Sequence, residues 1–177
     1  MSHPGLRARL LYRLTARLRC RLIQLDGHPY LERYYVGRFL GATVYLHRFL
    51  ASDGDREVHD HPWRWSCAWV LTGGYREERL RHLDPEQGWV ADMRRIGAGR
   101  LNCLTARSFH RVVDPRPETW TLFVHGPRVK QWGFLETAAE RGGAVYRPAA
   151  QASGGDWKRT APIGAHAGRQ PLGVARS

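Results

Sequence analysis

The stretch Val58–Gly74, VHDHPWRWSCAWVLTGG, carries the pattern that decides the fold. His59 and His61 are one residue apart, so on a β-strand both imidazoles leave the same face. The apolar run that follows, SCAWVL, is typical of a strand buried on both faces. Gly73 and Gly74 then end it with a turn. Two adjacent imidazoles are what a metal ion needs from its first two ligands.

A third histidine lies in a second strand-like segment, LNCLTARSFHRVV. Two imidazoles from one strand and one from a distant strand make the three-imidazole corner of a metal-binding β-barrel. Purely structural histidines are the competing interpretation, which the placement of His110 disfavours. Neutral imidazoles suit iron, zinc, copper, nickel or cobalt and do not choose among them. The sequence therefore predicts a metal site made by His59, His61 and His110.

Residues 30–135 consist of many short strand-like segments. Tyr, Val, Phe and Thr are frequent in them, and Gly, Pro and Asp turns separate them at intervals of about 8–12 residues. This spacing predicts an all-β sandwich or barrel.

The first 29 residues have a basic amphipathic pattern. Arginines alternate with leucines and no acid occurs before Asp26; the leucines at four-residue spacing are Leu6, Leu10, Leu14, Leu18 and Leu22. We expect residues 6–25 to form a helix whose leucine stripe packs on the barrel. A membrane-surface or nucleic-acid arm is the alternative, although no nucleic-acid motif accompanies it.

Residues 136–177 are rich in Ala, Gly, Pro and Arg, with little apolar periodicity. Such a segment buries too little apolar surface to order itself. We therefore expect a flexible tail.

The composition fits one globular domain with a real core. The formal net charge is +12, and all but Lys130 and Lys158 of the 28 basic residues are arginine. The arginine bias suits phosphate or carboxylate recognition, and a GC-rich genome would encode it equally well. Cys20, Cys67 and Cys103 are odd in number and lack a CxxC spacing, which predicts reduced thiols and a cytoplasmic protein. No apolar run approaches the ~20 residues of a transmembrane helix.

The histidine spacing resembles the cupin superfamily. Its first motif reads HxH, four residues, Glu, six residues, Gly; here it is matched by the two histidines, Ser66 in place of Glu, and Gly73. Its second motif places a Gly eleven residues before the third histidine, as Gly99 stands before His110. The resemblance covers residues 30–135. It implies a double-stranded β-helix, a jelly-roll barrel, with the amphipathic helix attached to its N-terminus.

Within the superfamily, the absent Glu makes the chain similar to the thiol dioxygenases. The phrases VHDHPW…GGYREE and FHRVV resemble their IHDH…G…KE and LHRVE. The chain also resembles a group of bacterial cupins bearing HDHPW and WGF. These resemblances imply Fe(II), a small-molecule substrate, dioxygen and pairing of two copies through edge strands. Zn, Ni, Co and Cu stay open as alternatives.

Other side chains are candidates for the cavity. Arg38 or Arg48 could grip a substrate carboxylate, and His125 could act as an acid–base group near the metal. Residues that could contact substrate are Ser66, Trp63 and His47, each of which has packing as its alternative role. We expect Glu77 and Glu78 to be solvated residues of a hairpin.

These observations favour a mononuclear non-haem Fe(II) cupin oxygenase that acts on a small carboxylate- or thiol-bearing metabolite. A non-redox metallo-cupin, working as an isomerase, lyase or hydrolase, is the first alternative. A ligand-binding cupin module is the second, because the fold hosts many unrelated activities.

Overall fold

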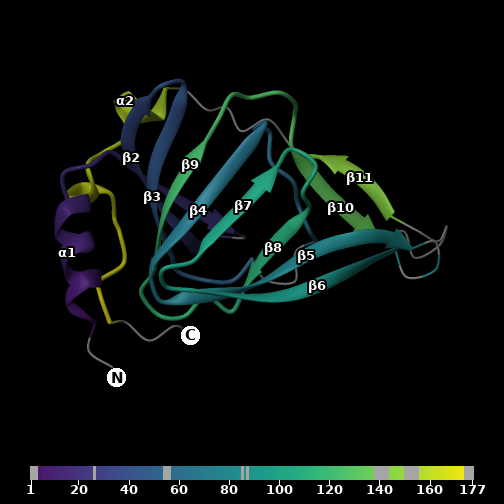
Figure 1. The fold of residues 1–177 in the computed structure, drawn as a ribbon. Helices are drawn as coiled ribbons and strands as arrows, with labels where there is room; N and C mark the ends of the chain where they lie inside the picture. Colours follow the sequence, from purple (N-terminus) through teal and green to yellow (C-terminus); the bar gives the residue numbers. More distant parts are fainter. Residues whose placement is uncertain are drawn as a thin grey trace.

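The computed structural model describes residues 4–25, 27–53, 57–84, 86, 88–137, 144–149 and 156–173. The protein is built mainly of β-strands, with a helix at its N-terminus (Figure 1). The helical segments are α1 (Leu6–Thr15), α2 (Trp157–Thr160) and a 3-10 turn, η1 (Gly164–His166). The strands are β1 (Cys20–Leu25), β2 (His28–Phe39), β3 (Ala42–Phe49), β4 (Trp65–Thr72), β5 (Gly74–Asp84), β6 (Gly88–Gly97), β7 (Leu101–Thr105), β8 (His110–Val113), β9 (Thr119–His125), β10 (Gly133–Thr137) and β11 (Ala144–Pro148).

Two antiparallel sheets form the barrel. The larger has the strand order β1-β2-β3-β9-β4-β7 and the smaller the order β6-β5-β8. His59 forms an antiparallel bridge with His110, so the segment before β4 extends the smaller sheet beside β8. The chain therefore crosses repeatedly between the two sheets from β3 to β9, which is the connectivity of a double-stranded β-helix. The predicted all-β fold with an N-terminal helix is confirmed.

Apolar residues pack on both faces of the larger sheet. Inside the barrel, one cluster joins the two sheets; it contains Leu31, Phe49, Val70, Tyr75 and Val112. On the outer face, a second cluster packs against α1; its buried members are Ala8, Cys20, Tyr34 and Trp120. Neighbouring residues of one strand point to opposite faces, so β2, β3 and β4 contribute to both clusters.

The N-terminal prediction is wrong in two respects. The helix covers only Leu6–Thr15, and Cys20–Leu25 is instead strand β1, paired with β2. A spacing of four residues fits one face of a helix and, being even, also one face of a strand, so the leucine pattern does not mark the boundary. Moreover, the side chains of Leu6, Leu10 and Leu14 are exposed rather than packed on the barrel.

Parts of the predicted flexible tail have defined positions on the barrel. Strand β11 pairs with β10, and Ile163 bridges Arg19. Further along, the Gln170 N–H donates to Glu32 at 2.7 Å. These contacts contradict a flexible tail for residues 144–149 and 156–173. The first segment is ordered by pairing with β10, and the second by contacts with the larger sheet and α1. Residues 138–143, 150–155 and 174–177 lie outside the described residues.

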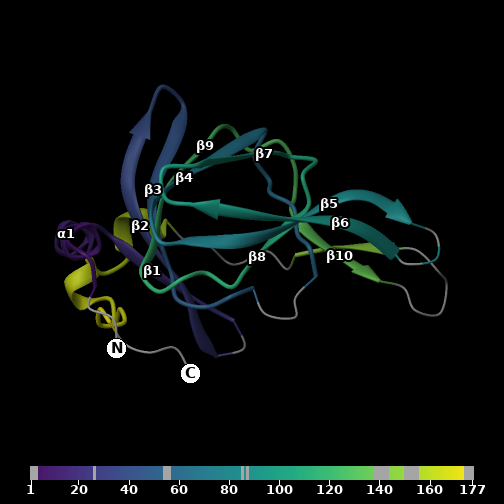
Figure 2. The same cartoon turned by 60° about the horizontal axis from the view of Figure 1, so that its bottom comes forward.

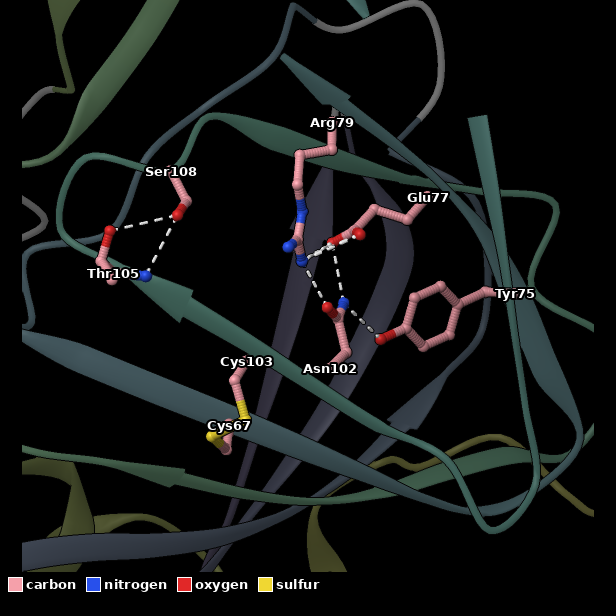
Figure 3. Close-up of a disulfide and its surroundings, with 8 residues drawn as sticks. All are labelled: Cys67, Tyr75, Glu77, Arg79, Asn102, Cys103, Thr105 and Ser108. Atoms are coloured by element: carbon pink, nitrogen blue, oxygen red, sulfur yellow. Dashed lines mark hydrogen bonds and ion pairs between the residues drawn. A yellow bond between two sulfur atoms is a disulfide. The ribbon is translucent and has the colours of Figure 1, made fainter. Parts of the chain in front are cut away.

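The prediction of reduced cysteines is also wrong for two of the three. Cys67 of β4 and Cys103 of β7 are cross-strand partners and form a disulfide (Figure 3). They are 36 residues apart in sequence, so only the register of the sheet brings them together. Cys20 remains a free, buried thiol. The prediction of a cytoplasmic location rested on reduced thiols, and two of the three cysteines are oxidised. Among the described residues, no helix is long and apolar enough to cross a bilayer.

Candidate metal centre

Three imidazoles converge at one end of the smaller sheet. The backbones of His59 and His110 exchange two N–H···O hydrogen bonds of 2.9 Å, which fixes these residues side by side. His61 follows His59 by two residues and turns its ring the same way. Its Nε2 lies 2.8 Å from Nε2 of His110, and one ring nitrogen from each of the three histidines lies within 4.8 Å of the others.

The protonation state of His61 suits a metal ion. Burial, followed by the charges of His110 and His59, holds the pKa of His61 well below its usual range. The imidazole is therefore neutral at physiological pH, which is the form that binds a metal. Three imidazole nitrogens this close together fit a transition-metal ion such as iron or zinc.

A buried carboxylate supports this cluster from behind. The Nδ1 atom of His110 lies 2.8 Å from Oε1 of Glu77, whose side chain is fully buried. Asn102 donates to the same oxygen at 2.7 Å, and Arg79 forms an ion pair with the carboxylate at 3.0 Å (Figure 3). Tyr75 closes the network by accepting a hydrogen bond from Asn102 at 3.0 Å.

The expectation that Glu77 is solvated is therefore wrong. In YREER, the residues Tyr75, Glu77 and Arg79 share the inward face of β5, while Glu78 faces the other way and pairs with Arg111. The polar sequence hid this alternation, although the parity of Glu77 with the aromatic Tyr75 was a usable signal. Burial raises the pKa of Glu77, but the hydrogen bonds from His110 and Asn102 and the charge of Arg79 outweigh it and lower the pKa to about 2.

A charged Glu77 changes the expected chemistry of the site. An imidazole that donates Nδ1–H to a carboxylate is held in one tautomer, with Nε2 directed at the metal, and is a stronger ligand. In the cupin motif the Glu would bring its negative charge directly to the metal. Here Glu77 carries that charge behind His110, where it contacts the ligand and not the metal.

His125 lies at the end of β9 behind a tryptophan. Its Nδ1 donates to the carbonyl of Gly126 at 2.8 Å, which leaves Nε2 as an acceptor. Trp63 stacks on His125, with ring centroids 4.1 Å apart, and also on His61 at 5.3 Å. Ser66 is buried directly opposite His125 in the sheet. Burial, together with the positive charges of Lys158, Arg33 and Arg38, lowers the pKa of His125, so the ring is a neutral base.

Arg33 is the inward-facing arginine that the sequence reading missed. It lies opposite His47 in the β2–β3 ladder, and its Nε donates to Nε2 of His47 at 3.0 Å. Its guanidinium also lies 5.5 Å from the centre of the Tyr45 ring. Within the described part of the chain no carboxylate pairs with it, and burial lowers its pKa. Its charge in turn contributes to the lowered pKa of His61.

The two arginines predicted to anchor a carboxylate are placed differently. Arg48 does not face the cavity, contrary to the expectation. It is only 3% exposed and pairs with Glu32 at 3.3 Å and Glu118 at 2.9 Å. It also donates to the carbonyls of Gln170 and Pro171. Its neighbour His47 faces the barrel, so Arg48 must face outward. Arg38 is exposed near the end of β2, where its charge contributes to the lowered pKa of His125.

His47 is buried in the barrel wall. It stacks on Phe123, with ring centroids 4.9 Å apart, and burial and the charge of Arg33 hold its pKa well below the usual range. Phe123 in turn contacts the rings of Trp63 and His61. The predicted residues Trp63, Ser66, His47 and His125 thus lie along one aromatic-lined wall that begins at the three histidines.

No family model matches the chain, and no curated protein matches its sequence. Solved structures give distant similarities. Fe(II)-HppE with the alternative substrate (S)-1-HPP is 11% identical, over 63% of this chain and 56% of that chain, with a TM-score of 0.47. KdgF from Halomonas sp. is 17% identical, over 61% and 94%, with a TM-score of 0.39. An uncharacterised conserved protein with a double-stranded β-helix domain from Klebsiella pneumoniae subsp. pneumoniae MGH 78578 is 15% identical, over 64% and 89%, with a TM-score of 0.42. This chain therefore spans just over half the length of HppE.

Proposed function

We propose that the protein is a mononuclear non-haem Fe(II) enzyme of the cupin type that uses dioxygen to oxidise a small metabolite bearing a carboxylate or a thiol. The observation that carries the proposal is the convergence of His59, His61 and His110, with Glu77 bound to the back of His110. The similarity of VHDHPW and FHRVV to the thiol dioxygenases favours iron over zinc, nickel, cobalt or copper. When bound, Fe(II) would supply the redox chemistry that joins dioxygen to the substrate.

Arg33 takes the role of carboxylate anchor in this proposal, in place of Arg48. Arg33 is half-buried, and a guanidinium removed from water is costly unless it is paired. Its partners among the described residues are the neutral ring of His47 and the face of Tyr45. A substrate carboxylate would satisfy the remaining donors bidentately. It would also bring a negative charge next to three neutral ligands.

The other side chains would shape and protect the site. Trp63 and Phe123 exclude water from the wall beside His61. The neutral His125, fixed by Gly126 through Nδ1, can accept a proton at Nε2 from a substrate that reaches past Trp63. Arg38, exposed at the end of β2, would guide an anion inward.

The test begins with elemental analysis of the purified protein beside its His110→Ala variant, with His82→Ala as the matched control because His82 is exposed on β5. We expect near-stoichiometric metal in the wild type and control and little in His110→Ala. Oxygen uptake is then measured after addition of Fe(II) and a panel of small thiols and carboxylates. Substrate-dependent uptake, with KM raised in Arg33→Gln and kcat little changed, supports the proposal.

Other outcomes point elsewhere. Stoichiometric metal without oxygen uptake would favour the non-redox alternative, in which the ion polarises a substrate oxygen as a Lewis acid. Failure of the wild type to bind iron or zinc after reconstitution would refute the three-histidine site and leave a ligand-binding module.

A further inference from the structure

Helix α1 presents an apolar ridge to solvent. It packs on the barrel through one face, formed by Ala8, Leu11, Tyr12 and Thr15. With 100° of rotation per residue, Leu6, Leu10 and Leu14 point in the opposite direction. They are 72%, 48% and 65% exposed. Single exposed leucines are ordinary, but three aligned on the outer side of a docked helix form a continuous apolar ridge.

Arginines flank this ridge and acids are missing from it. Arg7 lies on one side of the leucines, and Arg9 and Arg13 lie on the other; all three are exposed. Residues 4–25 contain no Asp or Glu. Among the described residues, none of these three arginines pairs with a carboxylate, whereas Arg48 and Arg79 on the barrel do.

The shape of the surface limits what can cover it. Figures 1 and 2 show α1 at the periphery, beyond the larger sheet, with no other element outside it. The three leucines lie along one line on a convex helix, so a flat surface can touch them all at once. A second copy of α1 would set arginines against arginines, and this repulsion disfavours self-association.

We propose that α1 docks the protein on an anionic phospholipid surface. Leu6, Leu10 and Leu14 would enter the boundary between headgroups and acyl chains, as the apolar faces of interfacial helices do. Arg7, Arg9 and Arg13 would contact lipid phosphates, which guanidinium groups bind bidentately. With only three leucines the binding is reversible and depends on charge. The helix occupies the outer face of the sheet, so docking leaves the metal centre in the barrel undisturbed.

The test is co-sedimentation of the full chain with vesicles of phosphatidylcholine, with or without phosphatidylglycerol. We expect binding only to the mixed, anionic vesicles, and weaker binding at high salt. Leu10→Ser combined with Leu14→Ser should reduce the affinity about tenfold or more, since each buried CH₂ contributes measurably. Arg7→Gln combined with Arg13→Gln should reduce it to a similar extent.

Matched controls come from the opposite end of the barrel. Leu83→Ser and Arg81→Gln change an exposed leucine and an exposed arginine near the far end of β5 and should leave binding unchanged. Thermal unfolding checks that all variants fold. The proposal is overturned if the wild type does not bind anionic vesicles, if it binds neutral vesicles equally well, or if the control variants lose as much affinity as the α1 variants. Metal content and oxygen uptake are measured independently of vesicle binding, so failure of this proposal is distinguishable from failure of the proposed function.

Discussion

Replacing Glu77 by Gln isolates the role of the carboxylate behind the metal centre. Glu77 Oε1 is shared by His110 at 2.8 Å and Asn102 at 2.7 Å, and the other oxygen faces Arg79 at 3.0 Å. The Gln side chain has nearly the same shape and can keep one acceptor for His110. Its NH₂ group, however, then faces the guanidinium of Arg79, so that two sets of hydrogen-bond donors oppose each other, and the negative charge is lost.

The magnitude follows from these contacts. Loss of such a partner of a metal-bound histidine costs 10–100-fold in metal affinity, roughly, in known sites. Because Glu77→Gln removes the charge and also disturbs Arg79 and Asn102, we expect a loss near the upper end, about 100-fold. This corresponds to about 2.7 kcal/mol.

The assay is competition between the metal-free protein and a chromophoric chelator for Zn²⁺ or Fe²⁺. Glu78→Gln is the matched control, since Glu78 is the next residue, faces away from the barrel and pairs with Arg111. The visible spectrum of bound Co²⁺ reports whether His110 keeps its orientation, which a purely structural role for Glu77 would not alter. An affinity of Glu77→Gln within about twofold of wild type and of the control, with an unchanged Co²⁺ spectrum, would refute the reasoning.

Three further predictions concern the scaffold. Arg48→Met leaves the buried Glu32 and the largely buried Glu118 without their cation, so the free energy of unfolding in urea should fall by about 3–5 kcal/mol. A loss below about 1 kcal/mol would contradict a stabilising role for these two ion pairs. Replacing both Cys67 and Cys103 by Ser opens a loop closed across 36 residues and should lower the free energy of unfolding by about 2–4 kcal/mol, whereas unchanged stability would mean that the disulfide does not form. The pKa of His47 in the fold lies well below its unfolded value of 6.5, so its contribution is present above that pH and is lost as pH falls below it, where the unfolded chain takes up the proton. Stability should accordingly decline from neutral pH towards about pH 5, and less steeply in His47→Gln; equal slopes would show that His47 also titrates in the fold.

The local pattern of the sequence was sufficient for the β-rich region of residues 30–135 and for the three histidines. Spacings of two residues decide which side chains share a face, so His59 and His61 could be placed together without a structure. The intervals between turns predicted the β-barrel, and the resemblance to the second cupin motif supported His110 as the third imidazole. Strand periodicity and turn spacing depend on neighbours along the chain, which is why the sequence alone predicts them. The structure brings the three predicted imidazoles together.

Which face of a strand points into the barrel depends on contacts that are distant in sequence, and only the tertiary structure decided it. Arg33 faces inward and Arg48 outward because β2 and β3 lie between two apolar clusters, one inside the barrel and one beneath α1. Glu77 is buried because Asn102 and His110 arrive from other strands to satisfy it. The disulfide follows from the register of β4 and β7, and the exposed leucine ridge from which face of α1 the sheet covers. The sequence pattern of a helix or strand tells which of its side chains share a face, whereas the elements that pack against it decide which face is buried.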